Sequence, residues 1–301
     1  MTLRVIVGPT AAGKSDLAMH LARERSLSII SADSRQVYQG FDIGTAKPSA
    51  FERALVPHYG IDVVAPTASY SAYAWARGAD RWISDASAAR RPAVIVGGTG
   101  FYVRALVSPL DALPPDETHR REALARWLDT LDGDEIARWC GMLDPARASL
   151  GRTQHVRAVE TALLSGRRIS DAYGMATAPV RAARYLLVDP GDGLAARIRA
   201  RVSRMVATGW LDEVAALRTT VPEDALAWKA SGYLVMRQHA DGRLDLDEAM
   251  ERVTIATRQY AKRQRTWFRH QLREGTVTTI HPEAHDARRR VLAWYDASDD
   301  A

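Results

Sequence analysis

The chain has 301 residues, of which 47% are hydrophobic and 26% charged, with a formal net charge of +5. This composition excludes a disordered or fibrous chain and predicts a globular protein of one large or two modest domains. Its single cysteine, Cys140, excludes an internal disulfide and suits the cytoplasm. We expect no signal peptide, because the chain starts on an apolar strand, and no membrane span, because no apolar run is long enough. The positive charge is compatible with a polyanionic partner.

Residues 8–15 form the first motif, Gly-Pro-Thr-Ala-Ala-Gly-Lys-Ser. They follow the apolar run 3–7, which predicts a buried strand, and precede helical spacing over 16–22. Strand, G-x-x-x-x-G-K-[ST] and helix are the context of a phosphate-binding loop, whereas a turn that binds nothing is the alternative. Backbone amides would surround a di- or triphosphate, Lys14 would hold a terminal phosphate, and Ser15 would bind Mg²⁺. The phosphate-binding residues expected here are Gly8, Thr10, Ala11, Ala12, Gly13, Lys14 and Ser15.

Polar residues follow two further predicted strands. Residues 27–31 read as a strand that ends at Asp33, and residues 92–96 read as a strand that ends in Gly97-Gly98-Thr99. Between them, 58–62 leads into another short strand, and 71–89 reads as an amphipathic helix. Ligand sites of α/β sheets lie at the carboxyl ends of strands, so Asp33 and Thr99 should reach the phosphate loop. The second glycine cluster is not G-x-G-x-x-G, which argues against a dinucleotide fold.

The middle of the chain changes character near Pro109. Residues 114–177 show successive apolar helical faces and no convincing strand, and strand character returns at 184–189. A basic helix over 194–209, a long helix over 245–272 and a strand over 277–280 follow. We therefore predict an α/β fold: a P-loop NTPase-like parallel sheet core, residues 1–115 and 180–301, with a helical insertion domain at 115–180.

The long helix carries a cationic stripe at positions 258, 262, 265, 269 and 273. We expect this stripe to lie beside a face with Tyr260, Gln264 and Trp267, an arrangement suited to phosphate contacts with aromatic and amide groups nearby for bases. A solvated surface with the aromatic residues in the core is the alternative.

Several motifs together resemble the tRNA dimethylallyltransferase family, in its bacterial form. They are, in family order, residues 8–15, Ser31–Tyr38 (Ser-Ala-Asp-Ser-Arg-Gln-Val-Tyr), Asp42–Pro48 (Asp-Ile-Gly-Thr-Ala-Lys-Pro), Gly97–Tyr102 and Thr257–Trp267. The matches spread over nearly the whole chain. The chain departs from the family at Gln154, where an arginine is usual.

This resemblance implies transfer of the dimethylallyl group of dimethylallyl diphosphate to N6 of an adenine beside the tRNA anticodon, with release of diphosphate. Asp33 would be the general base and Thr99 its partner, while Arg197 and Arg201 would clamp the diphosphate. We expect a monomer whose partners are dimethylallyl diphosphate and the anticodon stem-loop. The expected tRNA-binding residues are Asp33, Ser34, Arg35, Gln36, Thr99, Arg121, Gln154, Arg157, Arg258, Lys262 and Arg265.

Three other functions fit parts of the sequence. A P-loop kinase of small molecules would explain residues 8–15 but not the basic helix or the insertion. An RNA-binding protein with a nucleotide switch would leave Asp33 and Thr99 without a role. Prenyl transfer to free adenine nucleotides would not need a helical insertion.

Overall fold

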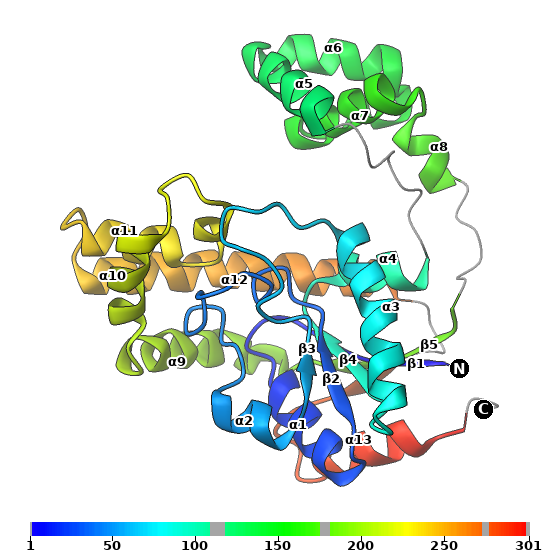
Figure 1. The fold of residues 1–301 in the computed structure, drawn as a ribbon, viewed down its shortest axis with the longest axis vertical. Coiled ribbons are helices and arrows are strands. Elements are labelled where there is room, and N and C mark those ends of the chain that lie inside the picture. The colour runs from blue at the N-terminus through cyan, green and yellow to red at the C-terminus, as the bar shows by residue number, and fades with distance from the viewer. Residues whose placement is uncertain (1, 109–117, 175–180, 273–276, 299–301) are drawn as a thin grey trace. The chain divides into compact units, whose positions relative to one another are not determined.

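The computed structural model describes residues 2–108, 118–174, 181–272 and 277–298, and Figure 1 shows its fold. The chain divides into two compact units, residues 1–107 with 181–301, and residues 108–180. The expected boundaries at 115 and 180 fall in ranges outside the described residues. Among the described residues, no helix combines the length and apolar character that crossing a bilayer requires.

Unit 1 contains a six-stranded sheet in the order β3-β2-β4-β1-β5-β6, and every pairing in it is parallel. The parallel α/β core predicted from the sequence is confirmed. The strands are β1 (Leu3–Val7), β2 (Ser28–Ser31), β3 (His58–Tyr59), β4 (Ala93–Gly97), β5 (Ala183–Val188) and β6 (Val277–Ile280).

Helices of unit 1 connect these strands and extend beyond them (Figure 1). They are α1 (Lys14–Glu24), α2 (Ala50–Leu55), α3 (Ala72–Ala88), α4 (Gly100–Val107), α9 (Leu194–Ala207), α10 (Trp210–Thr220), α11 (Tyr233–Ala240), α12 (Leu246–Gln271) and α13 (Ala287–Asp296), with short 3₁₀ turns at Gly191–Gly193 and Leu226–Lys229.

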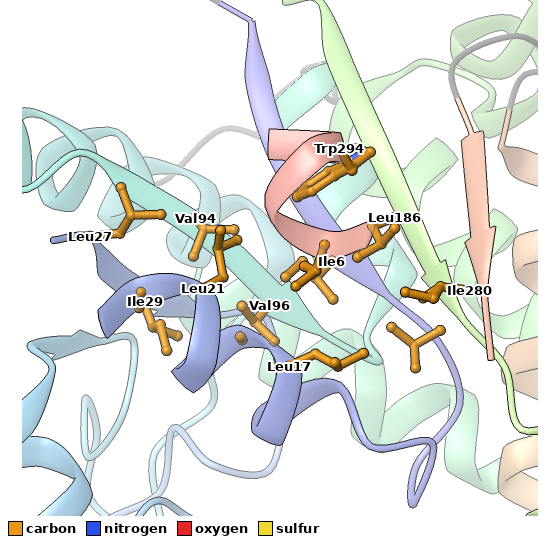
Figure 2. Packing of buried hydrophobic residues seen from close by; sticks show 14 of the residues in the cluster. Ile6, Leu17, Leu21, Leu27, Ile29, Val94, Val96, Leu186, Ile280 and Trp294 are labelled. Atoms are coloured by element: carbon orange, nitrogen blue, oxygen red, sulfur yellow. The ribbon is translucent and has the colours of Figure 1, made fainter. Parts of the chain in front are cut away.

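One face of the sheet is covered by α1 and α13 (Figure 2). Leu17 and Leu21 of α1 pack with Trp294 of α13 against strand residues such as Ile6 and Leu186. Since successive strand residues point to opposite faces, Val5 and Val7 face the other side and are also fully buried. A sheet buried on both faces explains why its strands read as continuous apolar runs.

Unit 2 is helical throughout its described residues. It consists of α5 (Thr118–Thr130), α6 (Gly133–Leu143), a 3₁₀ turn (Pro145–Arg147), α7 (Arg152–Ser165) and α8 (Ile169–Gly174). Leu128, Cys140, Ala158 and Val159 form its own small core.

The two ends of unit 1 that flank unit 2 meet each other. The backbone N–H of Arg181 donates to the carbonyl oxygen of Val107 at 3.3 Å. β1 thus pairs with β4 on one side and with β5 on the other, although unit 2 lies between β4 and β5 in sequence.

Candidate active site

The phosphate loop, residues 8–15, joins the end of β1 to the start of α1. A Cβ at Gly8 would lie 2.2 Å from the carbonyl oxygen of Val188, so only glycine fits there. Ala11, near the middle of the loop, has a φ of 61°, which costs a non-glycine residue about 1–3 kcal/mol. Gly13 is the N-cap of α1, whose first N–H groups lack partners within the helix. The loop can therefore surround an anion.

Lys14 interacts electrostatically with two charged residues near this loop, Arg201 and Asp33. Its ammonium donates to the carbonyl oxygen of Pro9 at 2.7 Å. Burial, helped by the positive charge of Arg201, lowers the pKa of Lys14 to about 8, and the carboxylate of Asp33 opposes this shift. Burial also lowers the pKa of Arg201, against the attraction of Asp33. The fold thus brings Lys14, Asp33 and Arg201, which are distant in sequence, into one electrostatic group.

Asp33 and Thr99 follow the adjacent strands β2 and β4, as the strand-end argument predicts. One carboxylate oxygen of Asp33 accepts the backbone N–H of Arg35 at 2.8 Å. The Thr99 hydroxyl accepts the N–H of Ser34 at 3.0 Å and is hydrogen-bonded to Tyr260. Burial and the negative charge of Asp33 raise the pKa of Tyr260, which stays a neutral hydroxyl. The Asp33 carboxylate is therefore held by the N–H of Arg35, and the next residue, Ser34, is held by Thr99.

A cavity opens beside Asp33 and Arg201. Thr10 of the phosphate loop, Asp33 and Arg201 line its polar part. An apolar and aromatic part of the wall comes from α9, α10 and α12: Val202, Met205, Trp210, Val253 and Tyr260. Trp210 is completely buried, and among the described residues its indole nitrogen has no hydrogen-bond partner. The cavity thus offers an anion site and an apolar wall side by side.

Arg197 and Arg201 are one turn apart on α9 but have different partners. Arg197 donates from Nε to the carbonyl oxygen of Ala11 at 2.9 Å and forms an ion pair with Glu283. Arg201 lines the cavity. Arg197 therefore supports the strained part of the loop, whereas Arg201 is placed to meet a bound anion.

The segment that follows Asp33 turns partly away from the cavity. Arg35 lines the cavity, but the Gln36 amide donates to the carbonyl oxygens of Thr45 and Ala46 at 3.3 and 2.9 Å. Its oxygen accepts the hydroxyl of Ser31 at 2.7 Å. RNA contact by Gln36 would require exchanging these hydrogen bonds.

The loop behind Gln36 rests on a buried cation. The side chain of Lys47 is 1% exposed and donates to Asp42, to Asp62 and to the carbonyl oxygen of Tyr38 at 2.5–2.6 Å. The carboxylate of Glu213 accepts backbone N–H groups of this loop, including that of Ile43 at 2.7 Å. These contacts fix the loop that carries the Asp-Ile-Gly-Thr-Ala-Lys-Pro motif.

Comparison with known proteins places this site in a family. The IPP transferase model matches residues 36–271, and the isopentenyl transferase model matches residues 1–55. The chain belongs to the IPP transferase family. The tRNA dimethylallyltransferase of Anaeromyxobacter sp. is 41% identical over 97% of both chains, and that of Gloeobacter violaceus 39% identical over 88% of both.

Solved structures resemble this family member along most of its length. The full-length tRNA isopentenylpyrophosphate transferase of Bacillus halodurans is 32% identical, with a TM-score of 0.67 over 97% of this chain and 93% of that one. A eukaryotic dimethylallyltransferase acting on tRNA, 23% identical, shares the fold with a TM-score of 0.83 over 97% of this chain and 78% of its own.

The basic helix of this IPP transferase family member, α12, has two faces with different surroundings. Arg258 and Lys262 are exposed and line a groove of about 450 Å³ with apolar residues of α9. Tyr260 is two residues from Arg258, about 200° around the helix, and lines the cavity on the other side. The expectation that the cationic stripe lies beside the Tyr260 face is therefore wrong: the two lie on nearly opposite sides of α12.

The remaining three residues of the stripe are Arg265, Arg269 and Arg273, and of these Arg265 has partners within unit 1. Arg265 forms an ion pair with Asp189 and donates to the carbonyl oxygen of Gly191 at 2.6 Å. Asp189, which follows β5, also accepts the N–H of Gly191. Arg269 is exposed, and Arg273 lies outside the described residues.

Three predicted tRNA contacts fall in unit 2. Gln154 and Arg157 are exposed and three residues apart on α7, so they share one face of that helix. The Gln154 amide oxygen accepts a hydrogen bond from Arg147. Arg121 belongs to α5, but its side chain is outside the part of the chain that the structure describes.

Ser15 is the candidate protein ligand for Mg²⁺ at this site. Ser15 is exposed in the first turn of α1, beside the phosphate loop. Within the described ranges, no group of three or more His, Cys, Asp or Glu side chains could hold a metal. This donor set fits Mg²⁺, because that ion keeps several waters and is bound mainly through substrate phosphates.

Sequence reasoning missed the apolar wall of the cavity. Val202 and Met205 share a helical face that periodicity could have identified within residues 194–209. Trp210 gave no comparable signal, because its position depends on how α10 packs against the loop at Gly44.

Proposed function

We propose that this protein transfers the dimethylallyl group of dimethylallyl diphosphate to N6 of an adenine beside a tRNA anticodon and releases diphosphate. The observation that carries the proposal is the single cavity into which the phosphate loop, Asp33 and an apolar wall all open. A five-carbon chain with a diphosphate end matches both parts of that cavity. The named transferase relatives support the same reaction and give no support to a kinase.

The residues divide the chemical work as follows. Backbone amides of the loop, Lys14 and Arg201 bind the diphosphate and stabilise the charge that grows on it as it leaves. Ser15 would hold Mg²⁺, which neutralises further phosphate charge when bound. The apolar wall formed by Val202, Met205 and Trp210 holds the chain and excludes water.

The acceptor side is assigned to Asp33. The adenine amine is a weak nucleophile, because its lone pair is delocalised into the ring. As N6 bonds to C1 of the donor, the C1–O bond breaks, its electron pair leaves with diphosphate, and the N6 proton passes to the Asp33 carboxylate. Thr99 and Ser34, joined by a hydrogen bond, position the amine and border the acceptor side.

tRNA binding is proposed for two surfaces. Exposed Arg258 and Lys262 contact phosphates of the anticodon arm, with Arg265 at the same edge. Unit 2 acts as a clamp on that arm through the face of α7 that carries Gln154 and Arg157, together with Arg121. Arg35 and Gln36 approach the loop nucleotides next to the target base. The proposal includes that the protein acts as a monomer in the cytoplasm.

The test is a transfer assay with purified protein, an unmodified tRNA transcript, Mg²⁺ and labelled dimethylallyl diphosphate. We expect label in tRNA at one adenosine, identified by mass spectrometry of the nucleosides, without any requirement for ATP. Lys14→Ala should abolish transfer and leave tRNA affinity unchanged, whereas Lys229→Ala, an exposed control, should retain both. Transfer of phosphate from ATP to a small molecule, without prenylated tRNA, would refute the proposal.

A further inference from the structure

Gln264 of α12 connects two parts of the site that are distant in sequence. Its side chain is buried, with 7% of the residue exposed. The amide oxygen accepts the backbone N–H of Thr10 at 2.8 Å, and the amide nitrogen donates to the carbonyl oxygen of Gly98 at 2.9 Å. One side chain thus bonds both the phosphate loop and the end of β4.

Each of these two backbone groups belongs to a peptide unit that the site also holds from its other end. The Thr10 N–H belongs to the same peptide as the Pro9 carbonyl, which accepts the ammonium of Lys14 at 2.7 Å. The Gly98 carbonyl belongs to the same peptide as the N–H of Thr99, which donates to Ala32 at 3.1 Å. Gln264 therefore fixes the orientation of the peptides next to Lys14 and Thr99.

Gly98 leaves the space that this amide occupies. A Cβ at Gly98 would lie 2.3 Å from Nε2 of Gln264, closer than any real contact, so a side chain there would displace the amide. The hydrogen-bonded link through Gln264 therefore requires glycine at position 98.

We infer that Gln264 is a positioning residue: it sets the distance between the bound diphosphate, on the Lys14 side, and the acceptor amine, on the Thr99 side. Only an amide, or a neutral carboxylic acid, can accept from Thr10 and donate to Gly98 at once. Because transfer needs the donor carbon and the amine in near contact, a loosened loop lowers kcat more than it lowers substrate affinity. This inference rests on the proposed function.

Gln264→Met tests it, because methionine keeps the length and removes both hydrogen bonds. We expect kcat to fall about 10- to 100-fold with the KM for tRNA within about twofold. Gln238→Met, an exposed glutamine of α11, is the control that should match the unchanged enzyme. Equal kcat for Gln264→Met and Gln238→Met would overturn the inference while leaving the proposed function intact, since the unchanged enzyme establishes transfer in the same assay.

Gln264→Glu gives a readout that simple loss of packing would not produce. A protonated carboxyl restores the donor to Gly98, whereas the carboxylate repels that carbonyl. At each pH, kcat of Gln264→Glu is divided by kcat of the unchanged enzyme. This ratio should approach 1 at about pH 6 and fall as the pH rises, because burial raises the pKa of the new carboxyl. A ratio that does not change with pH would contradict the inference.

Gly98→Ala completes the test and covers the case in which Gln264→Met folds poorly. The added methyl should expel the Gln264 amide and lower kcat by a factor similar to that of Gln264→Met. The double variant Gly98→Ala/Gln264→Ala should show a kcat no lower than that of Gly98→Ala or Gln264→Ala alone, since each substitution removes the same hydrogen-bonded link. Multiplicative losses would overturn the inference. Calorimetric titration with inorganic diphosphate gives a readout independent of transfer, and Gln264→Met should bind this probe more weakly than Gln238→Met.

Discussion

Diphosphate binding should weaken as the pH rises above about 8, because Lys14 loses its proton there. Burial is the main cause of this low pKa, and a bound diphosphate would raise it again. If the complex requires protonated Lys14, the dissociation constant grows as one plus ten to the power of the pH minus 8. It therefore rises by a factor of about 1.1 at pH 7, about 2 at pH 8 and about 11 at pH 9.

The measurement is calorimetric titration of the protein with inorganic diphosphate at these three pH values. Lys14→Arg is the matched variant, because arginine stays charged throughout, so its titration reports the ligand's own ionisation. The ratio of the two dissociation constants, unchanged protein over variant, should rise about tenfold from pH 7 to pH 9. A constant ratio would refute the reasoning.

The same pKa predicts an opposite trend for stability. The folded pKa of Lys14 lies at about 8, below the ordinary value of 10.5, so the unfolded chain binds more protons between these values. The contribution of Lys14 to the free energy of unfolding should therefore increase with pH across that window. Chemical denaturation of the unchanged protein and of Lys14→Met at pH 8 and 10 measures the difference.

Four further predictions concern other residues. Asp33→Asn should lower kcat by about 10²- to 10⁴-fold with little change in either KM; a raised KM for the diphosphate with kcat retained would place Asp33 at the metal instead. Replacing Arg258 and Lys262 by alanine should weaken tRNA binding and reduce its logarithmic salt slope by about 1.5, and an unchanged slope would mean that both are merely solvated. Arg265→Ala should also reduce the free energy of unfolding in urea, by about 1–2 kcal/mol, since it frees Asp189. Lys47→Met should cost about 1–3 kcal/mol in the same assay, because the Tyr38 carbonyl oxygen and the partly exposed carboxylates of Asp42 and Asp62 lose their donor; no measurable loss would show that water replaces the ammonium.

Buried strands were the most predictable elements. Parallel strands covered on both faces leave largely apolar runs such as β4, and the bounds of β1, β2, β4, β5 and β6 were all predicted within a residue or two, although the middle of β6 is two exposed threonines. The helix α13 was not singled out, because three arginines in its first turns hide the spacing of Val291 and Trp294, which pack against the sheet.

The site, like the fold, was predictable in part. The strand-end rule depends only on topology, and Asp33 does line one cavity with Thr10 of the phosphate loop, whereas Thr99 is hydrogen-bonded to Ser34 and Tyr260. Helical periodicity alone separates Arg258 from Tyr260 by about 200°, so the error over α12 was avoidable. The two bonds of Gln264 were not predictable, because a buried amide is selected by backbone groups that other segments place around it.

The hydrogen bond between Arg181 and Val107 means that unit 2 leaves and re-enters the core at one point. A short turn in place of residues 108–180 would therefore close the chain without stretching the sheet. During synthesis, however, β1 cannot gain its neighbour β5 until the whole insertion has emerged, so the sheet is completed late and through a contact of long sequence separation. Shortening the insertion should leave a core that folds faster, and sequence changes in unit 2 can accumulate without altering the register of the central strands.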